Sequence, residues 1–256
     1  MFRLAVVDRH AGRLHDSIDR LRDTAEIAKN AGPWILGRYH QEFGTTQRDL
    51  AATDRGPDYF ERALQSFRKA LYEFEAVGNH RYVAAVHNNI GFVLLALQRF
   101  PDSEGHLFVA RTLFASFGDQ VRCSQVDETL AQLYIAQARF DLAEEMIVRA
   151  VSVLEAADEE ALLSEALVTQ GRVLIGVGRP TEAKGAFDGA HRIAERCGHY
   201  EGAGLALLVL LEELPHHVLP SEKVVFITKM ERLLANSQQS SIKERIHNCV
   251  RQFESS

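Results

Sequence analysis

The sequence predicts an all-α solenoid of about five to six antiparallel helix hairpins with a C-terminal capping helix, and three observations support this fold class. The chain of 256 residues contains only six prolines, whereas Ala, Leu, Glu and Arg are abundant. Residues of similar size recur every forty positions, which is typical of stacked repeats. Apolar residues within each repeat follow helical spacing. Because one hairpin cannot bury its apolar face alone, the hairpins are expected to stack into a continuous core.

Five rows of residues are in register at the forty-residue period. Three rows contain small residues, one contains large apolar residues and one contains turn residues. We expect the small residues to let two helices approach closely, while the large residue fills the gap between them. The small rows are Ala63, Ser103, Ala143 and Ala183; Ala70, Ala110, Ala150 and Ala190; and Ala51, Gly91, Ala131 and Gly171. The large row is Phe67, Leu107, Ile147 and Phe187, and the turn row is Gly78, Gly118, Asp158 and Gly198.

The second repeat shows how each unit divides into two helices. Apolar residues at helical spacing predict a first helix over residues 83–97. The segment QRFPD interrupts this pattern, and Pro101 suits the first turn of a second helix. That helix is expected to run to about Phe117, where Gly118 can adopt the left-handed conformation that ends a helix.

Three segments resemble tetratricopeptide repeats: NNIGFVLLALQRFPDSEGHLFVA, TLAQLYIAQARFDLAEEMIVRA and TQGRVLIGVGRPTEAKGAFDGA. The forty-residue period is similar to the forms in kinesin light chain and in bacterial peptide-sensing and transcription-regulating proteins. The resemblance extends from about residue 44 to residue 200, and it implies a right-handed superhelical arrangement. The family pattern of large, small, aromatic and spaced alanine residues maps onto Leu130, Ala131, Tyr134, Phe140, Ala143 and Ala150.

The repeats predict that the whole chain is a single solenoid domain. Residues 12–32 resemble the second helix of an early repeat, and residues 1–10 supply only a stub of its first helix. Either the chain is a piece of a longer protein or a partner covers this stub. The expected repeats span about residues 1–32, 33–79, 80–119, 120–159, 160–199 and 200–236, with a cap over 239–254.

The resemblance implies that the first helix of each repeat lines a concave groove that holds a protein or peptide. Two adjacent asparagines then lie inside a first helix and not at its cap, and Asn89 best matches the groove asparagine of peptide-binding members. An amide offers two donors and an acceptor, which suits a peptide backbone. The candidate groove residues are Asn89, Asn88, Gln125, Glu128, Gln132, Arg172 and Arg48.

Other roles for these groove residues are also consistent with the sequence. The asparagines can be solvated polar residues on an exposed face, or they can bond between repeats. Glu128 and Arg172 can form an ion pair between repeats instead of contacting a ligand.

Net charge, apolar-run length and cysteine content indicate which partners and which compartment to expect. The net charge is −6 and no basic patch is evident, which argues against direct nucleic-acid binding. The longest apolar run, residues 205–211, is far too short to span a membrane. Three widely spaced cysteines without a CxxC motif fit a reducing compartment, so we expect a cytoplasmic protein.

The sequence contains no pattern that predicts catalysis, a metal or a cofactor. No HExxH motif occurs, and His216 and His217 are adjacent, so they cannot share one helix face. His80, His87 and His106 are expected at turns or surfaces. The cysteines have no partnered base, and no P-loop is present. We therefore expect no enzymatic activity.

The sequence thus favours a binding module, which acts as an adaptor or as the sensory part of a bacterial regulator. The alternative is an oligomerisation or scaffold domain of a larger transcription-regulatory or signalling protein. Assembly of that kind could use the N-terminal hairpin or the apolar C-terminal segment around residues 205–211.

Overall fold

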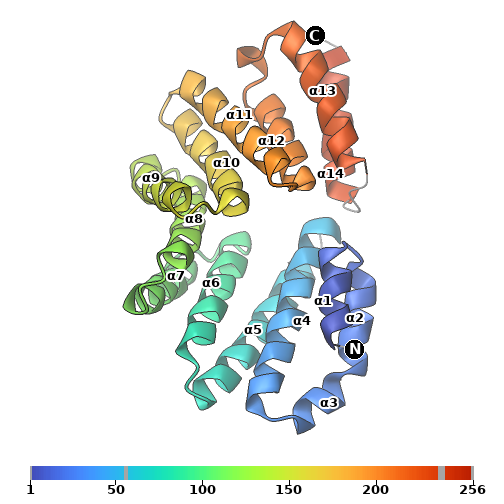
Figure 1. Cartoon of the computed structure of the whole chain (residues 1–256), viewed down its shortest axis with the longest axis vertical. Helices are drawn as coiled ribbons and strands as arrows, with labels where there is room; N and C mark the ends of the chain where they lie inside the picture. Colours follow the sequence, from blue (N-terminus) through green and yellow to red (C-terminus); the bar gives the residue numbers. More distant parts are fainter. Residues whose placement is uncertain (1, 55–56, 236–239, 255–256) are drawn as a thin grey trace. The chain divides into compact units, whose positions relative to one another are not determined.

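The computed structural model describes residues 2–54, 57–235 and 240–254, and all regular elements in these ranges are helices (Figure 1). The all-α fold of consecutive helix hairpins is therefore confirmed. Some residues of the expected repeats and of the expected cap lie outside the described residues. These are residue 1, residues 55–56 inside the expected repeat 33–79, and residues 236 and 239, at the ends of the last repeat and of the cap.

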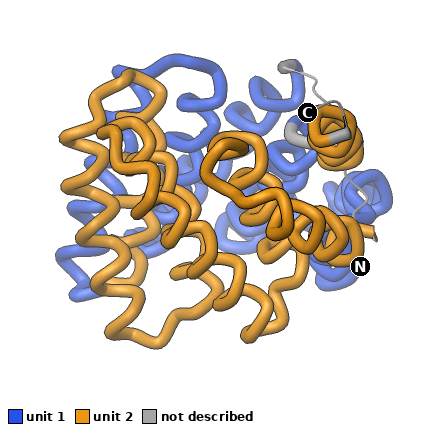
Figure 2. Tube along the Cα trace, turned by 90° about the horizontal axis from the view of Figure 1, so that it is seen from above, with its two compact units in different colours: residues 1–119, 238–241 blue, residues 120–237, 242–256 orange. Residues whose placement is uncertain are grey.

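The helices gather into two compact units, coloured separately in Figure 2. Unit 1 comprises residues 1–119 and 238–241, and unit 2 comprises residues 120–237 and 242–256. The division after residue 119 coincides with an expected repeat boundary, so each unit contains whole hairpins of the repeated region.

Unit 1 contains three helix pairs and a short extra helix. The pairs α1–α2, α4–α5 and α6–α7 each pack side by side, and α4 also contacts α6, the first helix of the next hairpin (Figure 1). The helices are α1 (Phe2–His10), α2 (Leu14–Asp23), α3 (Ala25–Asn30), α4 (Pro33–Asp54), α5 (Pro57–Ala76), α6 (His80–Ala96) and α7 (Phe100–Ser116).

The single helix expected over residues 12–32 is wrong, because the structure divides this segment into α2 and α3 at Thr24. The Thr24 hydroxyl donates a 2.9 Å hydrogen bond to the Leu21 carbonyl, and the Thr24 N–H donates to the same oxygen at 3.0 Å. These bonds tighten the last turn of α2, as threonine side chains do when they compete with helical bonding. The helix restarts where the Ala28 N–H donates to the Thr24 carbonyl.

Unit 2 repeats the same arrangement of paired helices. The first helices α8, α10 and α12 contact one another in order, and the second helices α9 and α11 pack between consecutive first helices. The expected helices over 221–236 and 240–253 correspond to α13 and α14. The elements are α8 (Gln120–Ala136), α9 (Phe140–Ala156), α10 (Glu160–Gly176), α11 (Pro180–Arg196), α12 (Tyr200–Glu213), the 3₁₀ helix η1 (Pro215–His217), α13 (Pro220–Leu234) and α14 (Ser240–Glu254).

In the α6–α7 and α10–α11 hairpins, the small residue of the first helix faces the large residue of its partner, as the sequence predicts. In α4–α5, the residue that lies directly against the Phe67 ring is Gly44, which is not in the predicted small row. A Cβ atom added to Gly91 would lie 2.6 Å from the Leu107 side chain, and one added to Gly171 would lie 2.6 Å from the Phe187 ring. Ser103 is buried between α6 and α7, where its hydroxyl donates a 2.7 Å hydrogen bond to the Gly91 carbonyl. The two helices of a hairpin therefore touch where the side chains are smallest.

Left-handed residues end the helices at a regular spacing of twenty positions. Each of helices α6 to α11 has 17 residues, and a three-residue turn completes the twenty. The residue after each left-handed position donates to a carbonyl five residues earlier, as Asn79 does to Phe74, which satisfies the free end of the helix. The left-handed residues of this series are Gly78, Gln98, Gly118, Ala138, Asp158, Gly178 and Gly198, and Gly12 and Gly32 have positive φ outside it.

These turns confirm the turn row of the sequence and add a second row to it. Gly118 adopts a φ of 69°, as expected for the residue that ends a second helix. The second row, Gln98, Ala138 and Gly178, closes the turn inside each hairpin and was missed because two of its residues have side chains that disfavour positive φ.

The apolar segment at residues 205–211 belongs to the core of unit 2. Leu207, Leu208 and Leu210 are fully buried, and the cluster around them includes Met230 of α13 and Ile242 of α14. The segment therefore does not offer an apolar surface to a second copy of the chain. Among the helices that the structure describes, none combines the length and the apolar character that crossing a bilayer requires.

The contact between Gly91 and Leu107 predicts a stability effect of opposite sign at two glycines of one hairpin. Gly91→Ala should lower the free energy of unfolding by about 1–3 kcal/mol, because the added methyl overpacks the interface with α7. Gly105→Ala, where no heavy atom lies within 4 Å, should raise it by about 0.5–1 kcal/mol through helix propensity. Urea unfolding followed by circular dichroism measures both, and equal effects would contradict the packing argument.

Candidate functional site

The first helices of unit 2 present a row of polar side chains, which we call the first-helix face of unit 2. It comprises Gln125, Glu128 and Gln132 of α8 and Thr169 and Arg172 of α10. Residues three or four apart share one side of an α-helix, so the three α8 residues form a stripe along that helix. Four of these five residues were expected in the groove, and the structure brings the two helices that carry them into contact.

Glu128 is the centre of this face. Its Oε1 atom accepts a 2.6 Å hydrogen bond from the Thr169 hydroxyl and a 2.5 Å hydrogen bond from the Gln132 amide nitrogen. Both donors are neutral, and no Lys, Arg or His lies within ion-pairing distance of this carboxylate in the described ranges. The carboxylate is therefore positioned by two helices without a directly paired cation.

The environment of Glu128 favours its protonated form. Burial raises the pKa of this carboxyl, and the nearby Glu165 raises it further, whereas hydrogen bonds from Thr169 and Gln132 and the charge of Arg172 lower it. The balance leaves the pKa above its ordinary value, so keeping Glu128 ionised at neutral pH reduces the stability of the fold.

The ion pair considered between Glu128 and Arg172 is wrong. The Arg172 guanidinium instead pairs with Glu213 on α12, at 2.8 Å between Nε and Oε1. Glu128 contacts Thr169 and Arg172 contacts Glu213, and in both cases the partner lies 41 residues further along the chain. Each polar residue thus reaches the next first helix, and this offset places Glu213, which sequence reasoning missed, on the same face.

Gln125 lies one turn before Glu128 and is partly exposed. Its side chain has no hydrogen-bond partner among the residues described in α8 and α10, whereas its backbone carbonyl accepts from the Thr129 hydroxyl at 3.0 Å. Gln125 and Gln132 therefore flank the Glu128 carboxylate with amide groups.

The first helices of unit 1 also bring expected groove residues together. The Arg48 guanidinium of α4 lies over the Phe92 ring of α6, 5.5 Å from its centroid. The same guanidinium donates to the Asp49 carboxylate at 2.8 and 3.1 Å, and Arg9 of α1 donates to Asp49 at 3.4 Å. Arg48 is thus held by an aromatic ring and a carboxylate.

Both asparagines lie in the interior of α6, as expected, while Asn79 caps its N-terminus. Asn89 is partly exposed, and its amide has no hydrogen-bond partner in the portion of unit 1 that is described. The amide oxygen of Asn88 is buried, also without a partner. Either orientation of the Asn88 amide leaves a polar atom at this position. A buried polar atom without a partner lowers the free energy of unfolding by about 1–3 kcal/mol.

Beside these asparagines, two histidines face each other across the α6–α7 hairpin. The Nδ1 atoms of His87 and His106 lie 2.8 Å apart, so one ring donates to the other. Burial, together with His106, lowers the pKa of His87 to about 4. Burial and the charge of Arg68 lower the pKa of His106, whereas Asp102 raises it. The expectation that His87 and His106 lie at turns or surfaces is wrong, since both are half-buried on helices.

The described residues include no group of three or more His, Cys, Asp or Glu side chains that could hold a metal ion. Cys123, Cys197 and Cys249 all carry free thiols, and burial raises the pKa of Cys249, which makes this thiol a weak nucleophile.

No model of a known protein family matches this sequence, and no curated protein sequence matches it. Solved structures with the same fold do exist. A Rap protein complexed with competence and sporulation factor superposes with a TM-score of 0.74 at 14% identity, over 93% of this chain and 68% of the Rap chain. BtubC (BKLC) from P. vanneervenii superposes with a TM-score of 0.62 at 21% identity, over 76% of this chain and 78% of that chain.

A third structure extends the same comparison. A kinesin light chain with nearly identical TPR-like repeats, from Podosopora anserina, superposes with a TM-score of 0.58 at 12% identity, over 77% of this chain and 94% of that chain. Identities this low establish the fold alone. The chain therefore has a tetratricopeptide-like fold, which confirms the resemblance seen in its repeats.

The pKa shift of Glu128 predicts an unusual dependence of stability on pH. Since the folded pKa is raised above the unfolded value near 4.5, the stability that the neutral carboxyl provides is present below that value and is lost as pH rises through the folded pKa. Glu128→Gln retains an oxygen that accepts both hydrogen bonds and does not ionise. It should be more stable than the parent at pH 7 and similar to it at pH 4.

Urea unfolding at the two pH values measures this difference. Glu155→Gln, on the exposed side of α9, is the matched control and should change stability equally little at both pH values. A Glu128→Gln variant that is less stable than the parent at pH 7 would contradict the assignment.

Proposed function

We propose that this protein binds a peptide or a peptide-like segment of a protein on its first-helix faces, as an adaptor or as the sensory part of a bacterial regulator. The Glu128 carboxylate carries the proposal. Two neutral donors orient this carboxylate, and its ionisation reduces the stability of the fold.

The ionisation of Glu128 is unnecessary for the fold. A glutamine would accept the same two hydrogen bonds without the free-energy penalty of a partly buried charge. Groups that destabilise a fold are concentrated at functional sites, where the strain is compensated when a ligand binds. A cationic group of a partner, such as a Lys or Arg side chain or a peptide N-terminus, would supply the charge that Glu128 lacks.

Asn89 in unit 1 fits the same function by a different chemistry. Its amide can accept a hydrogen bond from a peptide N–H and donate one to a peptide carbonyl. It can therefore bind the main chain of an extended peptide whatever the peptide sequence. The amides of Gln125 and Gln132 beside Glu128 can do the same in unit 2. In peptide recognition, hydrogen bonds to the peptide main chain can supply affinity, while contacts with peptide side chains supply specificity. The amides would play the first role here and Glu128 the second.

The comparison with solved structures supports a binding role for this fold. A Rap protein with the same fold has been solved in complex with competence and sporulation factor. We propose that this chain likewise uses stacked hairpins to hold a short ligand, and that the ligand differs because the two sequences are only 14% identical.

A peptide array tests the proposal directly. The protein should select peptides that carry Lys, Arg or a free N-terminus, and Glu128→Gln should weaken the best of them about tenfold, or ~1.4 kcal/mol, by calorimetry. Gln125→Ala, in the same unit, should weaken all selected peptides to a similar degree, because its contact is with the backbone.

Glu155→Gln is again the control, and helicity by circular dichroism must stay unchanged in every variant. Selection of acidic peptides, or an affinity that Glu128→Gln leaves intact, would contradict the proposed contact. Failure of the array to retain any peptide would contradict the proposed function itself.

Self-assembly is a second candidate function, and α13 supplies the observation that favours it. Leu219, Val224 and Val225 are more than half exposed, although α13 is part of a well-packed unit. Val225→Lys should reduce any self-association detected by sedimentation velocity without changing the free energy of unfolding. A parent chain that sediments as a monomer at high concentration would contradict this candidate.

A further inference from the structure

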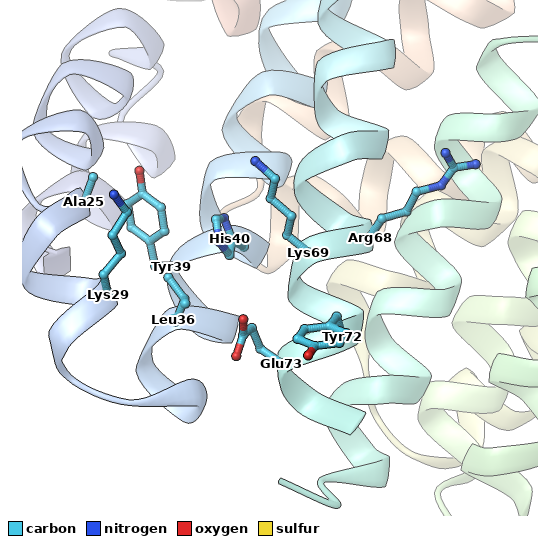
Figure 3. A pocket seen from close by; sticks show the side chains of 9 residues that line it. All are labelled: Ala25, Lys29, Leu36, Tyr39, His40, Arg68, Lys69, Tyr72 and Glu73. Carbon is cyan, nitrogen blue, oxygen red and sulfur yellow. The ribbon is translucent and has the colours of Figure 1, made fainter. Parts of the chain in front are cut away.

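A pocket of about 520 Å³ lies in unit 1 between α3, α4 and α5, in a part of the molecule that the proposed peptide site does not use (Figure 3). Side chains advance by about 100° per residue along a helix. The mean direction of Leu36, Tyr39 and His40 around α4 is therefore about 180° from that of Arg48 and Asp49. The pocket and the surface that carries Arg48 and Asp49 thus lie on different sides of α4.

Ammonium groups enter this pocket from two walls. Lys29 comes from α3 and lies beside the Tyr39 ring, while Lys69 comes from α5 and extends over His40 (Figure 3). Lys29 donates a 2.6 Å hydrogen bond to Glu26. Lys69 has no carboxylate partner among the described residues of the pocket and its surroundings, so its charge is uncompensated at the mouth of the pocket.

Neutral hydrogen-bonding groups lie between the two lysines. Burial, together with the charge of Lys69, lowers the pKa of His40 to about 4, so the ring is uncharged at neutral pH. Burial raises the pKa of Tyr39, so its hydroxyl remains a donor. The α4 wall therefore offers an imidazole and a phenol without adding a negative charge.

The remaining walls are apolar, with one carboxylate at the far end. Leu36 and the Tyr72 ring line the pocket, and Glu73 projects below His40 on the Leu36 side (Figure 3). Arg68 also contributes to the lining, but its guanidinium points away from the two lysines. The pocket is thus polarised, with cations at one end and an apolar surface and a single carboxylate at the other.

We propose that this pocket binds a small molecule that carries one oxyanion, a carboxylate or a phosphoryl group, on an apolar body. The oxyanion lies between Lys29 and Lys69, where ammonium groups and neutral donors together replace its hydration. The apolar body contacts Leu36 and Tyr72. Glu73 repels molecules with a second anionic group at the far end.

The size of the pocket agrees with such a ligand. Small-molecule sites usually have volumes of about 300–1,000 Å³, mostly apolar walls and a few convergent polar groups. A pocket of 520 Å³ falls within this range. A ligand here would bridge α3, α4 and α5, and would therefore stabilise the short helix α3 against the first long hairpin.

Phenyl phosphate and phenylacetate are suitable probes, since they place the two kinds of oxyanion on the same aromatic body. Calorimetry should detect saturable binding of at least one probe, and the tighter of the two identifies the preferred group. Benzyl alcohol, which lacks the charge, should not bind. Lys69→Gln should weaken the binding about tenfold or more, while helicity stays unchanged.

Arg62→Gln is the matched control, because it removes a positive charge from an exposed position of the same helix, α5, that does not line the pocket. Its affinity for the probe should equal that of the parent. Equal losses in Lys69→Gln and Arg62→Gln would indicate general attraction to a basic surface and would overturn the proposal. Absence of saturable binding below about 10 mM would also overturn it.

The test is independent of the proposed peptide site. Glu128→Gln should leave the affinity for either oxyanion probe unchanged, and Lys69→Gln should leave peptide selection unchanged. Each proposal can therefore fail while the other holds.

Discussion

The close contact between a small residue on the first helix of a hairpin and a large residue on its partner is the constraint on which the rest of the structure depends. Gly91 against Leu107 and Gly171 against Phe187 leave no room for a Cβ atom. The contact sets how near the two helices lie and which faces they turn toward each other. The same contact occurs in α6–α7 and in α10–α11, and all helices from α6 to α11 have 17 residues, so these hairpins share one register.

That register determines what the polar surface can do. Two first helices in register bring a residue near its counterpart about forty positions on, so a carboxylate on α8 meets Thr169 of α10 and a guanidinium on α10 meets Glu213 of α12. Packing in the apolar interior thus sets the spacing of the polar residues on the surface. These polar residues lie on regular helices, where their spacing is rigid, and not on loops.

Some polar groups are placed at the expense of stability. Glu128 is partly desolvated without a cation, and the Asn88 amide oxygen is buried without a partner. The well-packed hairpins beneath these groups provide enough stability to tolerate them. Lys69 is different, because an exposed lysine has a small desolvation cost, and its significance lies in the pocket beneath it.

The sequence by itself determined the helices, their pairing, the small and large rows and the turn row at Gly78 and its counterparts, because these features depend on local spacing and side-chain size. Only the tertiary structure decided the break at Thr24, the left-handed Gln98 and Ala138, the choice of Glu213 as partner of Arg172, and the meeting of His87 with His106. The physical reason is that these contacts join residues whose distance is set by packing between helices. Periodicity specifies which side of a helix a residue occupies, but the atom it meets there depends on how closely the neighbouring helix approaches.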